Sequence, residues 1–133
     1  MVLGLVVGSV VNMALVTVSP HVIPPPPGVD VSDPVSIRAS VHLFEPKHFL
    51  FPFLAHALGT LAGALTAGVM AGSGRRLAAG FVGAFFLLGG IAACSMIPAP
   101  KWFVAADLLL AYLPTAWLGL ALAQRVRGPD QAN

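Results

Sequence analysis

Charged side chains are confined to a few short stretches of this 133-residue chain. Four long runs hold one acidic residue, Asp107, and otherwise no charge: residues 1–29, 48–74, 77–100 and 102–124. A helix needs about 20 apolar residues to cross a hydrocarbon core roughly 30 Å thick. Each run is long enough for one crossing and too short for two. The sequence therefore predicts an all-α integral membrane four-helix bundle, with spans near 2–22, 49–71, 78–97 and 103–124.

The composition excludes a soluble globular enzyme. Hydrophobic residues make up 57% of the chain and charged residues 9%, whereas a soluble domain carries about 25% charged residues. The basic residues separate apolar runs instead of clustering on one wet face, so nucleic acid is not an expected partner. The single cysteine, Cys94, excludes an internal disulfide framework. The expected partner is the lipid bilayer, with a second copy or other membrane subunits as further candidates.

One membrane domain is predicted over residues 1–127, followed by a polar tail over 128–133. The arginines next to the spans are Arg75, Arg76, Arg125 and Arg127. Because cytoplasmic loops carry the excess of Lys and Arg, both termini are predicted to be cytoplasmic. A signal peptide is the alternative interpretation of the first span. A retained helix is favoured, because the span lacks the basic start and the small-residue cleavage site of a signal peptide. The Ala-, Gly- and Pro-rich usage favours a bacterial inner membrane.

The first outer loop, residues 23–47, carries its own helix signals. Asp33 followed by Pro34 is typical of a helix cap and a first helical position. We expect a short amphipathic helix over 34–44, lying on the membrane surface or over the bundle as a lid. Similar Ile-Pro and Pro-Lys pairs flank both outer loops, which favours two helical-hairpin repeats related in parallel.

Small residues recur every four positions in three of the spans, where close packing drives helix association in lipid. The rows are Gly4, Gly8 and Asn12; Ala55, Gly59, Gly63, Ala67 and Ala71; and Ala111, Thr115, Gly119 and Ala123. Asp107 lies four residues before Ala111, so it is expected to face protein. Pro114 frees the carbonyl of Leu110, and the resulting kink could open a cavity beside Tyr112.

A polar site is predicted in the outer half of the bundle. At 1.5 Å per residue, His56 and Asp107 lie at similar depth below the outer surface. A buried ionisable group there needs a partner, a neutral form or a water-filled cavity. The candidate ligand or proton site comprises His56, Asp107, Asn12, Thr60 and Tyr112. The alternative is a structural role for His56, Asp107 and Asn12, as a packed side chain or a hydrogen bond, and lipid contact for Tyr112.

His42, Glu45 and His48 form a His-x-x-Glu-x-x-His string in the outer loop. Imidazole and carboxylate suit a transition metal, which is the one cofactor the sequence suggests. Pro46 interrupts the string, so its members need not share a helix face. A wet interfacial segment is the alternative interpretation.

Three functions fit these patterns, and no catalytic residue is assigned. The first is a non-enzymatic bundle that binds a ligand or lipid, or that serves as a subunit of a membrane complex. The second is a small proton- or cation-coupled transporter that uses Asp107. The third is a membrane enzyme with a His/Asp pair or a metal at its site.

Overall fold

The computed structural model describes residues 1–127, and these form helices and connecting turns without a strand. The helices are α1 (Val2–Val22), α2 (Pro34–Ser40), α3 (Leu50–Met70), α4 (Arg75–Met96), α5 (Lys101–Leu110) and α6 (Leu113–Arg127), with short 3-10 turns η1 (Val41–Leu43) and η2 (Pro46–Phe49). Four segments in this part of the chain are long and apolar enough to cross a membrane. The all-helical prediction and the four spans of membrane-crossing length are thereby confirmed. The tail predicted at 128–133 lies outside the described residues.

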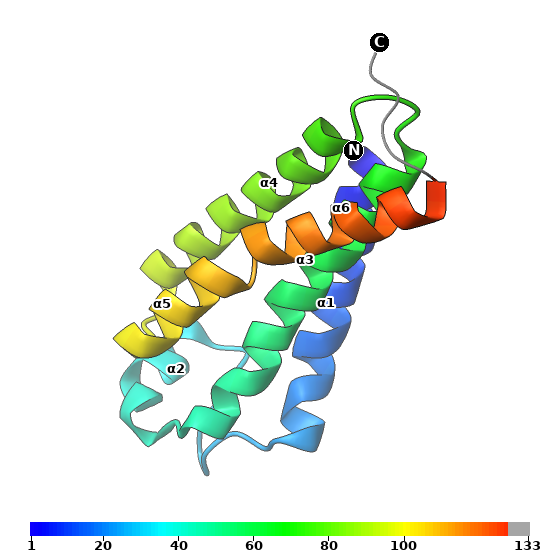
Figure 1. The fold of residues 1–133 in the computed structure, drawn as a ribbon. Coiled ribbons are helices and arrows are strands. Elements are labelled where there is room, and N and C mark those ends of the chain that lie inside the picture. Colours follow the sequence, from blue (N-terminus) through cyan, green and yellow to red (C-terminus); the bar gives the residue numbers. More distant parts are fainter. Residues whose placement is uncertain (128–133) are drawn as a thin grey trace.

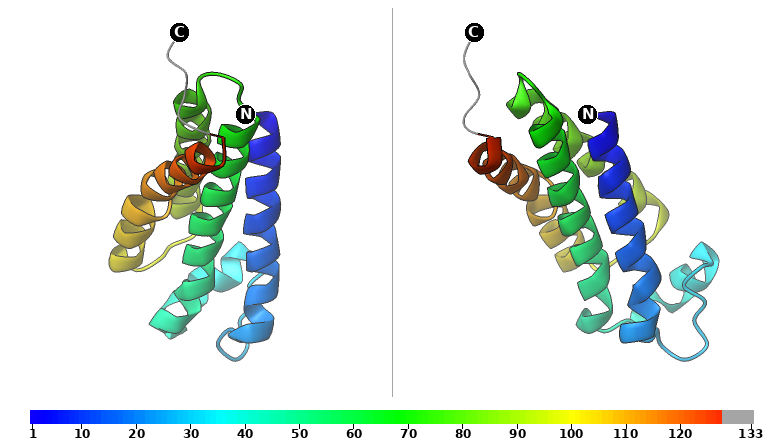
Figure 2. Two further views of the ribbon diagram at one scale, coloured as in Figure 1. Left: turned by 45° about the vertical axis from the view of Figure 1, so that its right-hand side comes forward. Right: turned by 90° about the vertical axis from the view of Figure 1, so that its right-hand side faces the viewer.

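The long helices run side by side, and α3 lies at the centre of the arrangement (Figure 1). Helix α1 packs along one side of α3, while α4 and α6 pack along its other sides (Figure 2). The N-terminus and the turn between α3 and α4 lie at one end of the molecule, here called the N-terminal end. Helix α2 lies at the opposite end, here called the α2 end.

Glycines allow α1 and α3 to approach through their backbones. A methyl group on Gly8 would lie 2.7 Å from the carbonyl oxygen of Gly59, and one on Gly59 would lie 2.9 Å from that of Gly8. The same reciprocal contact joins Gly4 to Gly63 one turn further along. These distances are too short for a real methyl group, so the backbone contact requires glycine on both helices.

The fourth span, predicted over 103–124, is found at Lys101–Arg127 and is broken into two helices close to the kink expected at Pro114. Helix α5 ends at Leu110 and α6 begins at Leu113, with Pro114 in its first turn. Proline has no N–H to donate to the carbonyl of Leu110. The Thr115 hydroxyl instead donates to the carbonyl oxygens of Ala111 at 2.6 Å and Tyr112 at 3.0 Å.

The first outer loop contains a shorter helix than the expected 34–44. Asp33 caps α2 by accepting from the backbone N–H groups of Val35 and Ser36, and Pro34 follows as its first residue. The α-helix ends at Ser40 and gives way to the 3-10 turn η1. The Arg38 guanidinium donates to the carbonyl oxygen of Met96, which attaches α2 to the last turn of α4.

Candidate functional site

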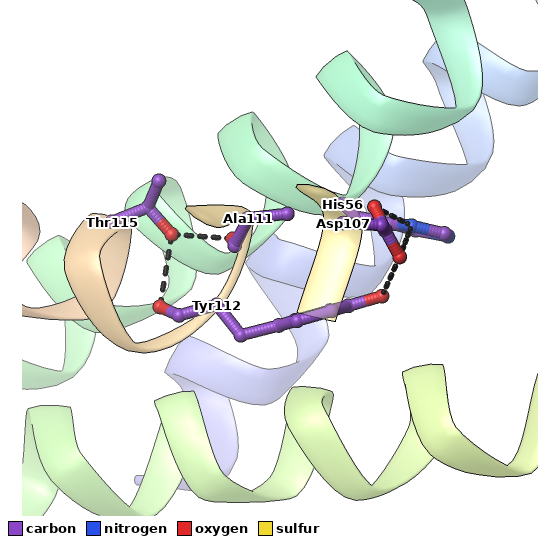
Figure 3. Close-up of polar contacts among 5 residues, drawn as sticks. All are labelled: His56, Asp107, Ala111, Tyr112 and Thr115. Atoms are coloured by element: carbon purple, nitrogen blue, oxygen red, sulfur yellow. Dashed lines mark hydrogen bonds and ion pairs between the residues drawn. The ribbon is translucent and has the colours of Figure 1, made fainter. Parts of the chain in front are cut away.

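Three polar side chains from α3, α5 and the break after α5 form one hydrogen-bonded cluster, here called the Asp107 cluster. The Nδ1 of His56 lies 2.8 Å from Oδ1 and 3.0 Å from Oδ2 of Asp107. The Tyr112 hydroxyl donates to Oδ2 at 2.9 Å (Figure 3). Asp107 is 1% exposed, whereas the His56 side chain is 24% exposed. The carboxylate therefore uses both oxygens within the protein, and His56 is the member that a ligand can reach.

The break in the fourth span shapes this cluster. Asp107 sits near the end of α5, and Tyr112 follows five residues later, between α5 and α6. The two side chains meet across this break through the Tyr112 hydroxyl. The Tyr112 ring also lies near-parallel to the His56 ring, with centroids 5.6 Å apart and planes 28° apart. Tyr112 thus contacts both other members of the cluster, Asp107 through a hydrogen bond and His56 through its ring.

Gly90 on α4 provides the space that the Tyr112 ring occupies. A methyl group on Gly90 would lie 2.5 Å from Cζ and 2.8 Å from Cε2 of Tyr112, and closer still to the hydroxyl oxygen. Sequence reasoning missed Gly90, because the sequence carries no signal that pairs it with Tyr112. Sequence reasoning also assigned Thr115 only to a row of small packing residues. The position of Thr115 directly after Pro114 indicates that its hydroxyl can donate to the carbonyls at the break.

The cluster borders an apolar cavity of about 320 Å³ at the α2 end. Its lining residues come from α1, the α2 segment, η2, α3, α4 and α5. Its apolar wall includes Val16, Ile37, Phe44, Pro52, Ala93 and Phe103. Five polar side chains also line it: Ser19, His48, His56, Cys94 and Asp107. A largely apolar cleft with a few polar groups is the usual form of a small-molecule site, and this volume lies at the lower end of the usual range.

Asn12 and Thr60 are not brought into the Asp107 cluster. Asn12 packs against Gly59 at the contact of α1 and α3, where a methyl group on Gly59 would lie 3.0 Å from the Asn12 Cβ. Thr60 is fully buried on α3, one turn beyond His56. The structure gives no hydrogen-bond partner to Asn12 Oδ1 or Thr60 Oγ1. Of the five predicted ligand-site residues, His56, Asp107 and Tyr112 meet, while Asn12 and Thr60 remain apart.

The three predicted metal ligands are not brought together either. The Nδ1 of His48 accepts from the backbone N–H of Glu45 at 2.8 Å, and the Glu45 carboxylate pairs with Lys47 at 3.0 Å. Both side chains belong to a capping box that starts η2 at Pro46. His42 lies exposed in η1. Over residues 1–127 no group of three His, Cys, Asp or Glu side chains is arranged to hold a metal ion.

No family model, curated protein or solved structure matches this chain. Its function is therefore inferred from the geometry of the site.

Proposed function

We propose that this chain is a non-enzymatic membrane protein that binds a ligand with an apolar body and a hydrogen-bonding group. The ligand occupies the cavity at the α2 end. The observation that carries the proposal is the Asp107 cluster beside an apolar cavity of about 320 Å³. Here His56 offers one free ring nitrogen among apolar side chains. A polar group with this setting gives orientation and specificity, while the apolar wall gives affinity.

The cost of burying Asp107 supports a role beyond packing. Insertion scales assign about 2.5–3.5 kcal/mol to an aspartate at the centre of a membrane helix. Two protein donors reduce that cost, one from His56 and one from Tyr112. A structural hydrogen bond between helices needs no cavity beside it, whereas this cluster borders one. The carboxylate therefore acts as the group that fixes the His56 ring for a ligand.

The proposal includes the topology. The four spans form a bundle in a bacterial inner membrane, with both termini cytoplasmic and the α2 end facing outward. The positions of the arginines support this orientation. The hairpin of α1 and α3 and the hairpin of α4 with α5–α6 are proposed to be parallel repeats, of which the first carries the α2 insertion. A cysteine-labelling map with an impermeant maleimide tests the orientation at Ser32, expected outside, and Ser73, expected inside.

Probe binding to the full chain in lipid nanodiscs tests the proposed pocket. The probes are 1-decanol, which has an apolar chain and one hydroxyl, and decane, which has none. Bound probe is counted by mass spectrometry after removal of free probe, with empty nanodiscs as the background. We expect about one 1-decanol per chain above background.

Two matched variants on α4 separate the cavity from the lipid-facing surface. Ala93 lines the cavity, while its neighbour Ala92 is exposed on the outside of the helix. Ala93→Phe places a ring in the cavity and is expected to abolish saturable binding, and Ala92→Phe is expected to leave it unchanged. Equal loss in both variants, or binding by neither the native chain nor the variants, would falsify the proposed pocket.

Acid–base chemistry is a second candidate, favoured by one feature of the Asp107 cluster. A carboxylate that binds Nδ1 of a histidine orients the ring and leaves Nε2 to take or give a proton. His56 has this arrangement toward Asp107. Bound probes that carry an ester or a hydroxyl are recovered, and their masses are measured by mass spectrometry in the same assay. Recovery of unchanged probes supports binding alone, and conversion that His56→Asn abolishes supports the enzyme.

A further inference from the structure

Two histidines line the cavity at different positions along η2 and α3. His48 lies in η2 and His56 in the second turn of α3, with Pro52 between them. All three residues line the cavity. At about 2.0 Å per residue for the two steps out of the 3-10 turn η2 and 1.5 Å for the six steps within α3, the two histidines lie about 13 Å apart along the chain axis. Among the five polar side chains that line the cavity, the two histidines thus provide contact points with the apolar Pro52 between them.

The hydrogen bonds of His56 define the role of its free nitrogen. Asp107 accepts from Tyr112 and lies within 3.0 Å of His56 Nδ1 through both oxygens. A carboxylate accepts hydrogen bonds, so Nδ1 carries the proton. In its neutral form the ring then has a lone pair on Nε2 and accepts at that atom. The described part of the chain provides no partner for Nε2, so the inner contact point calls for a ligand donor.

His48 has the opposite assignment. Its Nδ1 accepts from the backbone N–H of Glu45 at 2.8 Å, as part of the capping box of η2. A longer approach of 3.3 Å to the Glu45 carbonyl oxygen is the weaker contact. A neutral ring that accepts at Nδ1 carries its proton on Nε2 and donates there. The edge of the ring packs against Phe44, which also lines the cavity. The outer contact point therefore calls for a ligand acceptor.

We infer that the ligand of this pocket is an elongated, mostly apolar molecule with a hydroxyl at its inner end and a neutral acceptor oxygen, such as an ester carbonyl, at its outer end. This inference rests on the proposed function. Its length is set by the separation of the two histidines. An extended chain advances about 1.25 Å per bond, given bond lengths near 1.5 Å, so about ten bonds join the two groups. Methyl 10-hydroxydecanoate has this length and these groups.

Three probes of one chain length test the two contact points in nanodiscs that contain the full chain. Methyl 10-hydroxydecanoate carries both groups, 1-decanol carries the hydroxyl alone, and methyl decanoate carries the ester alone. One hydrogen bond changes affinity by up to about tenfold. We expect the hydroxy ester to bind about tenfold more tightly than either of the other probes.

Asparagine variants remove each free nitrogen and keep the internal hydrogen bond, because the asparagine amide reaches the place of Nδ1. His56→Asn is expected to make the hydroxy ester bind like methyl decanoate. His48→Asn is expected to make it bind like 1-decanol. His42→Asn is the matched control, since His42 is exposed and does not line the cavity, and it should change neither preference.

The outcomes separate this inference from the proposed pocket. If the native chain binds the hydroxy ester no more tightly than 1-decanol, or no more tightly than methyl decanoate, the two-point inference is overturned and the pocket stands. The two-point inference is also overturned if His42→Asn acts like the other two variants. If no probe binds above empty nanodiscs, the pocket and the inference both fail.

Discussion

Replacement of Gly90 by alanine tests whether the fold depends on the packing around the Asp107 cluster. A methyl group there would lie 2.5 Å from Cζ and 2.8 Å from Cε2 of Tyr112. The ring cannot move away freely, because its hydroxyl donates to Asp107 at 2.9 Å and its face lies against His56. Tyr112 is also 1% exposed, so the ring is enclosed by protein. Gly90→Ala is therefore expected to displace the ring and to break its hydrogen bond.

The expected loss of stability has two parts. Overpacking of a filled core costs about 1–3 kcal/mol. A hydrogen bond between membrane helices contributes about 0.6 kcal/mol on average and up to about 1.7 kcal/mol. The free energy of unfolding should therefore fall by about 2–4 kcal/mol. The adjacent Gly89 is the control, because a methyl group on it meets nothing within 4 Å. Gly89→Ala reports the change in helix propensity alone.

Reversible unfolding in bicelles, followed by the fluorescence of Trp102 and Trp117, measures both variants. A double-mutant cycle with Tyr112→Leu isolates the contact. With leucine at 112, the ring that the new methyl group would strike is absent. Gly90→Ala should then lower the free energy of unfolding by less than about 1 kcal/mol, which is the lower limit for overpacking. If Gly90→Ala is as stable as Gly89→Ala, or if its cost is the same with leucine at 112, the explanation given for Gly90 is wrong.

Two further predictions concern the α1–α3 contact and the outer loop. Gly8→Val inserts a side chain 2.7 Å from the carbonyl oxygen of Gly59 and should lower the free energy of unfolding by at least about 1–3 kcal/mol. Gly80→Val is the control, because a methyl group on Gly80 meets nothing within 4 Å. Equal unfolding midpoints for the two variants would contradict the packing argument. Hydrogen bonds from the side chain and then the backbone of Ser32 lower the pKa of Asp30 below its ordinary value of 3.8. These hydrogen bonds therefore stabilise the turn at Asp30 fully at pH values above that ordinary pKa. The contribution is lost as the pH falls through the lowered pKa. Ser32→Ala should raise the pKa of Asp30 in a carbon-detected NMR titration, and an unchanged titration curve would show that the hydroxyl is not responsible.

The sequence predicts the four spans well because the membrane imposes a simple length rule on them. The runs near 2–22, 49–71 and 78–97 correspond to α1, α3 and α4 within a few residues. The small-residue rows also locate buried positions, such as Gly8, Gly59 and Gly119. These features depend on period and composition, which are local properties. They need no knowledge of which helix lies next to which.

The pairing of His56 with Asp107 lies at the limit of such reasoning. Their similar depth follows from counting residues inward from Lys47 and Lys101, because both spans start at the same side. Their contact also requires α3 and α5 to turn the correct faces toward each other, and depth alone does not determine that rotation. Asn12 and Thr60, which were placed in the predicted site from their rows of residues, lie outside the cluster and have no hydrogen-bond partner for Oδ1 and Oγ1.

The cavity depends on tertiary structure that no local pattern encodes. Its wall draws on α1, α3, α4 and α5 together with the α2 segment. The α2 segment is attached to α4 through Arg38 and the Met96 carbonyl, residues 58 positions apart. The outer-loop helix is predicted from its cap, but its place beside the cavity involves this distant contact.

Pro114 connects the local sequence to the geometry of the site. Because proline supplies no N–H to the carbonyl of Leu110, the helix that carries Asp107 ends there, and the chain turns before α6 begins. This turn allows the Tyr112 hydroxyl to reach Asp107 from five residues away. Thr115 then donates to the carbonyl oxygens of Ala111 and Tyr112, which lowers the cost of the break in an apolar environment. A continuous fourth helix would place residues 107 and 112 on different faces, since five residues turn the helix by about 500° at 3.6 residues per turn. The break is thus a requirement of the Asp107 cluster, and with it of the oriented His56 that the proposed ligand contacts.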